Sequence, residues 1–123
     1  MRATFGITLA AVIFGFGAAA QPSHTNAVDR ASAIKAAARL TIGMREEVAE
    51  KILATNGLRN PLKMGCSHGW ICFYSLADHS SLGIEIRPKR ARADGAWADG
   101  LVEAALIQKN GSNIVSITLT NRP

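Results

Sequence analysis

The dipeptide Asn110-Gly111 is the feature that most constrains the fold of this chain. It separates two segments, 101–109 and 113–120, and in the second of these Val115, Ile117 and Leu119 alternate with polar residues. Alternation with a period of two is typical of strands, and Asn-Gly favours a hairpin because both positions tolerate a positive φ. The sequence therefore predicts a C-terminal β-hairpin.

Two further strands precede this hairpin. Apolar residues occupy both faces of segment 70–76, which indicates a central strand. A second strand, 82–87, follows the polar turn 78–81, and Ile84 and Ile86 mark its buried face. The stretch 88–100 has no regular period, which predicts a surface loop.

Helical spacing dominates the earlier part of the chain. Asn26 is expected to cap a first helix whose apolar residues recur at intervals of three and four: Val28, Ala31, Ile34 and Ala38. A second helix has one apolar face, formed by Val48, Ala49, Ile52 and Leu53. Asn56-Gly57 ends it, because Gly57 can adopt the left-handed conformation that closes a helix.

This order of elements predicts an α+β fold. We expect two N-terminal helices packed on a four-stranded antiparallel β-meander, in a single domain at 27–123 that follows a flexible lead-in at 21–26.

The first twenty residues have the organisation of an export signal. Arg2 is followed by an uncharged apolar stretch, and Ala18 and Ala20 form the small-x-small pattern of a cleavage site. We expect cleavage after Ala20 and a periplasmic or secreted protein. The alternative is a retained membrane anchor, because the uncharged stretch approaches the ~20 residues of a spanning helix.

The charge of the chain is moderately basic. It has 14 Lys and Arg against 9 Asp and Glu, a net charge of +5. Such an excess is common on exported proteins and permits weak contact with an anionic membrane surface. Export argues against nucleic acid as a partner.

Cys66 and Cys72 are the two cysteines of the chain, and in an oxidising compartment they predict a disulfide. The alternative is a metal site formed by Cys66, His68, Cys72 and His79, although the spacing is not a usual zinc pattern. No cofactor is predicted.

Two polar segments are candidate sites. Asp78-His79-Ser80-Ser81 holds the residue types of a hydrolase triad, but a triad assembles from distant segments, so this one indicates a turn and no catalytic residue is predicted. The second segment is a basic run followed by a tryptophan. It is a candidate binding loop for anionic lipid or polysaccharide, formed by Arg87, Lys89, Arg90, Arg92 and Trp97.

The segment 40–48, with Gly43-Met44 before a helix that stops at Asn56-Gly57, resembles the opening of the small outer-membrane lipoprotein A family. This family includes the small lipoprotein of the outer-membrane β-barrel assembly machinery, and its fold is similar to that of β-lactamase inhibitory proteins. Two features differ: Gln21 stands where the lipid-bearing cysteine would be, and Arg45 stands where a capping Ser or Thr is common. The resemblance implies a binding or scaffold module of the cell envelope.

The expected function is therefore an exported, non-catalytic module that binds an envelope protein, in assembly or as an inhibitor. A metal-binding or hydrolytic protein and a binder of anionic lipid or polysaccharide are the alternatives.

Overall fold

The computed structural model describes residues 25–66, 69–91 and 97–121. The predicted export signal lies outside these residues. The helices are α1 (Arg30–Ala37) and α2 (Glu46–Thr55). The strands are β1 (Thr41–Ile42), β2 (Leu62–Cys66), β3 (Gly69–Ser75), β4 (Ser81–Ala91), β5 (Trp97–Lys109), β6 (Ser112–Ile117) and β7 (Thr120–Asn121).

The prediction of two helices on a four-stranded meander was wrong, because strands dominate the fold. The main sheet has five antiparallel strands in the order β2-β3-β4-β5-β6, and β1 and β7 form a separate parallel pair. The strand β2 was not predicted, because Leu62 and Met64 are too few apolar positions to define a strand pattern clearly. The stretch 88–100 was predicted to be a loop, whereas β4 and β5 continue through much of it as paired strands.

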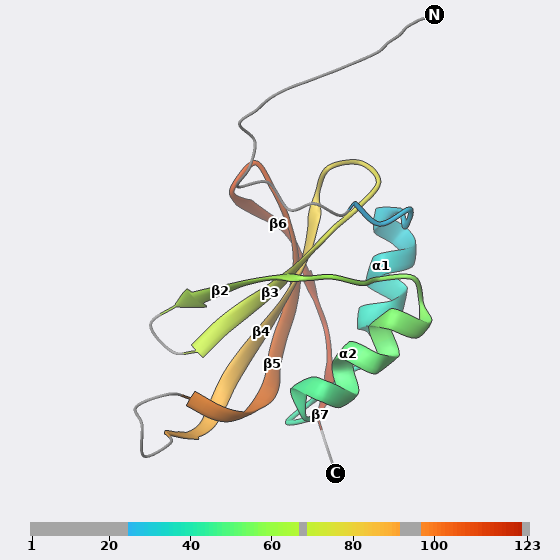
Figure 1. Cartoon of the computed structure of the whole chain (residues 1–123). Helices are drawn as coiled ribbons and strands as arrows, with labels where there is room; N and C mark the ends of the chain where they lie inside the picture. The colour runs from blue at the N-terminus through green and yellow to red at the C-terminus, as the bar shows by residue number, and fades with distance from the viewer. Residues whose placement is uncertain (1–24, 67–68, 92–96, 122–123) are drawn as a thin grey trace, which may run out of the picture.

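Both helices lie on the same side of the sheet (Figure 1). We call the sheet face toward the helices the inner face and the opposite one the outer face. Alternate residues of β3, β4 and β5 point inward and form one core with the helices. These buried residues include Cys72, Tyr74, Leu82, Ile84, Ile86, Val102, Ala105 and Ile107 from the sheet, and Ala33, Ala36, Ala37, Ala49 and Leu53 from the helices.

The helix ends differ in part from the prediction. Asp29, not Asn26, caps α1, and its carboxylate accepts a hydrogen bond from the Ser32 amide at 2.7 Å. Asn26 is buried instead, and its side chain donates to the carbonyl of Ser75 at 3.1 Å and accepts from the Arg59 amide at 3.0 Å. Asn26 therefore ties the start of the described chain to the end of β3.

The predicted C-terminal hairpin is confirmed. Lys109 pairs with Ser112 across a turn in which Asn110 has φ 53° and Gly111 has φ 80°. Two positive φ values in a two-residue turn match the right-handed twist of the strands that it joins.

Candidate functional site

The outer face of the sheet carries apolar side chains that the helices do not cover. Pairing between β2 and β3 places Leu62 opposite Phe73 and Met64 opposite Ile71 on this face. The exposed fraction is 43% for Leu62 and 52% for Met64. Two large apolar side chains next to each other on an edge strand are therefore open to solvent.

A glycine in β4 shapes the middle of this face. A Cβ atom on Gly83 would lie 3.1 Å from Phe73 Cε1, 3.2 Å from Leu106 Cδ1 and 3.4 Å from Ile71 Cγ2. The three side chains therefore close over the backbone of β4. Beside them runs a shallow groove lined by Leu62, Met64, Phe73, Ser75, Ser81 and Gln108.

The strand β2 forms one edge of the sheet. Among the described strands it pairs with β3 alone, so its second edge presents backbone N–H and C=O groups without a strand partner. Such an edge is a template for an added strand. We call Leu62–Cys66 with its exposed side chains the β2 edge.

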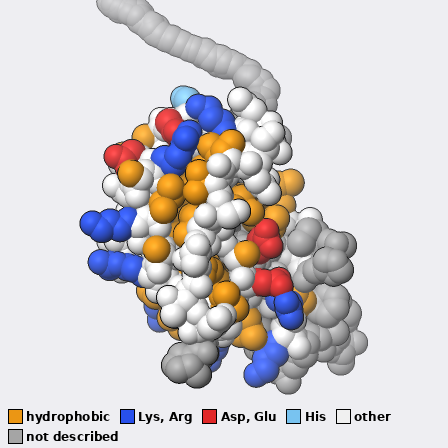
Figure 2. Space-filling view, turned by 180° about the vertical axis from the view of Figure 1, so that it is seen from behind, with side chains coloured by type: hydrophobic (Ala, Val, Ile, Leu, Met, Phe, Trp, Pro, Cys, Tyr) orange, Lys and Arg blue, Asp and Glu red, His pale blue; other side chains and the backbone are white. Residues whose placement is uncertain are grey.

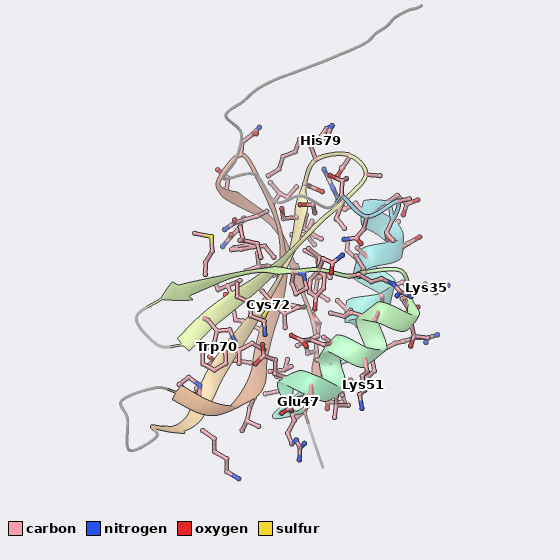
Figure 3. The ribbon with its side chains drawn as sticks, viewed as in Figure 1. Lys35, Glu47, Lys51, Trp70, Cys72 and His79 are labelled. Carbon is pink, nitrogen blue, oxygen red and sulfur yellow. The ribbon has the colours of Figure 1, made fainter. Side chains whose placement is uncertain are left out.

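On the inner side of the β2 edge, three groups donate hydrogen bonds to the carboxylate of Glu46. Its Oε2 atom accepts from Lys63 Nζ at 2.9 Å, from Trp70 Nε1 at 3.1 Å and from Cys72 Sγ at 3.4 Å. Lys63 Nζ also lies 3.1 Å from Glu50 Oε2. Figure 3 shows Trp70 and Cys72 on the sheet beside α2. We call these residues the Glu46 cluster.

The environment of the Glu46 cluster shifts several pKa values. Burial, followed by the negative charge of Glu46, raises the pKa of Cys72 to about 12. Burial also raises the pKa of Tyr74. Burial of Lys63 opposes its charged form, but hydrogen bonds to Glu46 and Glu50 outweigh that effect and raise its pKa. Lys63 is thus held as a cation and Cys72 as a neutral thiol.

The Glu46 cluster also contains groups that can ligate a metal ion. Ligand atoms of Glu46, Glu50 and Cys72 lie within 4.8 Å of one another, which is close enough for a metal ion. In this structure the ammonium group of Lys63 bonds both carboxylates. The cluster therefore serves to fasten α2 to β2 and β3.

The structure does not support the predicted disulfide. Cys72 is a free, buried cysteine. Strand pairing sets Cys72 opposite Lys63 and Cys66 opposite Gly69, a register offset of three residues, or ~10 Å along a strand. Disulfides join residues whose Cα atoms are less than ~7 Å apart. The prediction failed because Cys66 pairs with Gly69, so Cys72 lies three positions further along β3 than the partner of Cys66.

Of the alternative metal set, the two side chains that the structure describes, Cys72 and His79, do not lie together. His79 lies in the turn between β3 and β4 with φ 67°, at the far end of β3 from the Glu46 cluster (Figure 3). His68 and the side chain of Cys66 lie outside the described part of the chain. Asp78 accepts hydrogen bonds from the Ser80 amide at 3.0 Å and from Arg30 at 2.8 Å. Residues 78–80 lie in the predicted turn between β3 and β4, and Ser81 already belongs to β4.

The predicted basic binding loop is largely strand. Arg87 and Lys89 lie on β4, and Arg87 forms an ion pair with Glu103 of β5, which compensates its charge. Arg92 and the side chains of Arg90 and Trp97 lie outside the described part of the chain. Figure 2, a view from behind, shows Lys and Arg side chains at the top, along the left side and at the lower right of the molecule.

Sequence reasoning missed the β2 edge. The available signal was the alternation of Leu62 and Met64 with Lys63 and Gly65, a short period-two pattern just after Pro61.

Comparison with known proteins finds no match to this chain. No family model matches the chain, and neither the curated proteins nor the solved structures include a match. Among the described residues, no helix is both long and apolar enough to cross a membrane.

Proposed function

We propose that this chain is an exported, non-catalytic module that binds another protein of the cell envelope through the β2 edge and the adjoining outer face. The observation that carries the proposal is the combination of an open strand edge with the exposed side chains of Leu62 and Met64. Neither feature contributes to the core on the inner face.

The chemistry of this surface suits an extended protein segment. An added strand gains affinity from main-chain hydrogen bonds along an edge, and specificity from alternate side chains that enter pockets beside it. The β2 edge offers main-chain hydrogen bonds to such a strand. The groove at Phe73 offers an apolar pocket, with Ser75, Ser81 and Gln108 as polar contacts.

Two sequence features support the proposal that the protein works in the cell envelope. The export signal predicted at residues 1–20 would deliver the chain outside the cytoplasm. The segment 40–58 resembles a family of envelope lipoproteins with binding and scaffold roles.

Site-specific photo-crosslinking tests this proposal. A photoreactive residue replaces Met64 in one variant and Val48 in another; Val48 is a matched control, since it lies on α2 and is 43% exposed. We expect Met64, but not Val48, to crosslink in cells to a protein other than this chain. The captured protein should then bind the purified chain and lose at least about ten-fold in affinity to the Met64→Lys variant.

Equal adducts at both positions, or no adduct with another protein at Met64, would show that the β2 edge is not the binding surface.

A further inference from the structure

We propose that the side of the helices that faces away from the sheet binds the surface of an anionic lipid bilayer. Three basic residues carry this proposal: Lys35 on α1, Arg39 just after α1, and Lys51 on α2. We call them the basic helix side. They lie across the sheet from the outer face, so the proposal adds a second binding surface to the one in the proposed function.

The acidic side chains of the helical part of the chain bond groups of their own chain. Those described within residues 25–59 are Asp29, Glu46, Glu47 and Glu50. The basic helix side differs, because its three side chains are exposed and form no ion pair with a described residue. This side of the molecule therefore presents positive charge that the fold does not neutralise.

The three cations lie on the solvent side of the helices. Arg39 follows Lys35 by four residues, and the Arg39 amide still donates to the Ala36 carbonyl at 3.1 Å, so both side chains share one side of a helical turn. Figure 3 shows Lys35 and Lys51 on the side of the helices away from the sheet. Seen from behind, Lys and Arg side chains project from this side, on the left of Figure 2.

The composition of the basic helix side fits a bilayer surface better than a protein. The cores of protein interfaces are rich in aromatic residues and depleted in lysine. Neither α1 nor α2 contains an aromatic residue. A bilayer requires mainly positive charge, because each Lys or Arg close to anionic headgroups increases affinity by about five-fold.

Val48 adds an apolar contact beside these charges. It precedes Lys51 by three residues, which places the two side chains on the same side of α2. Val48 is 43% exposed and is the one exposed large hydrophobic residue of the described helices. A bilayer that contacts Lys51 therefore also meets Val48, whereas Met64 on the β2 edge stays free for a protein partner.

Vesicle co-sedimentation tests the proposal with the exported protein purified from cells. The probes are vesicles of phosphatidylcholine alone and vesicles that also contain about one third phosphatidylserine. We expect binding to the anionic vesicles only. The affinity should fall as salt is added, because salt screens the attraction between exposed charges.

Two matched double variants separate the basic helix side from net charge. Lys35→Gln/Lys51→Gln and the control Lys89→Gln/Lys109→Gln each remove two lysines, and the control residues lie on β4 and β5 without an ion pair to a described residue. The first should weaken binding about 25-fold and the second less than about three-fold. Lys35→Arg/Lys51→Arg keeps the charge and should bind like the wild type.

A fluorescent label tests the orientation on the bilayer. In a Cys66→Ser background, Val48→Cys and Met64→Cys carry the same environment-sensitive dye, since the two native side chains are 43% and 52% exposed and the remaining Cys72 is buried. Anionic vesicles should shift the emission of the dye to the blue at position 48 and leave it unchanged at position 64.

Equal losses in the glutamine variants, equal binding to both kinds of vesicle, or a blue shift at position 64 alone would overturn the proposal. Binding to a soluble acidic polysaccharide without binding to vesicles would also overturn it, because the occupant would then be a different polyanion. Photo-crosslinking at Met64 tests the proposed function separately, since the two surfaces lie on opposite sides of the sheet.

Discussion

The two faces of the central sheet differ in what their side chains do. On the inner face, Leu82, Ile84 and Ile107 are almost fully buried against the helices. On the outer face, Leu62 and Met64 are about half exposed although they are equally apolar. The difference leaves two apolar side chains of the edge strand open to solvent, and we propose that these side chains serve binding.

The largest contrast should appear in thiol reactivity. Because the pKa of Cys72 is raised to about 12, its thiolate fraction near pH 8 should be about a thousand-fold lower than in the unfolded chain. We expect Cys72 in a Cys66→Ser protein to react with a thiol reagent at least that much more slowly when folded. A cysteine at position 64 should react at nearly its unfolded rate. Similar rates at both positions would contradict the comparison.

The raised pKa of Cys72 also predicts how the free energy of unfolding changes with pH. The folded thiol holds its proton to a higher pH than the unfolded thiol, so the folded state binds more protons between pH 9 and about 12. The stabilisation is complete below pH 9 and is lost as the pH rises through this window. The free energy of unfolding of Cys72→Ala should therefore decline less with pH over that range than that of the wild type.

A matched pair of leucines tests the comparison in free energy. Leu82→Ala leaves a cavity in a fully buried site and should lower the free energy of unfolding by about 2–5 kcal/mol. Leu62→Ala removes a side chain that is 43% exposed and should cost less than about 1 kcal/mol. Denaturant unfolding measures both. Similar losses would mean that the outer face is part of the core.

Two glycine-to-alanine substitutions should differ in the same direction in free energy of unfolding, but by a smaller amount. A Cβ atom at Gly100 would lie 2.5 Å from Ile86 Cγ2 and 2.6 Å from Trp70 Cζ2, so Gly100→Ala must displace one of these side chains. We expect a loss of about 1–3 kcal/mol and a shift in tryptophan fluorescence. Gly65→Ala has open space and should be neutral or slightly stabilising. A costly Gly65→Ala would show that the fold itself requires this glycine.

The parts of the fold that the sequence predicted are those with strong local signals. Asn110-Gly111 defined a hairpin, and Gly57, with φ 85°, closed α2 as expected. The missed strand β2 is short and contains Lys63 and Gly65, and its side chains face solvent or a salt bridge instead of the core. Local periodicity carries little information about such a strand, because pairing with β3 decides its structure.

The candidate site was harder to predict for a related reason. Glu46 lies on α2 while Lys63 and Cys72 lie on neighbouring strands, and only tertiary packing brings them together. The predicted disulfide required the two cysteines to lie opposite each other, whereas the register of β2 and β3 pairs Cys66 with Gly69 and Cys72 with Lys63. The openness of the outer face depends on where both helices lie, which no single segment specifies.

The most direct test of the central claim is the effect of Met64→Lys on binding compared with its effect on stability. Met64 is 52% exposed and lies outside the core, so the free energy of unfolding should change by less than about 0.5 kcal/mol. Binding of the protein captured at Met64, measured by titration with the purified chain, should weaken at least about ten-fold. Unchanged binding by a fully folded Met64→Lys variant would contradict the claim that the β2 edge is the binding surface.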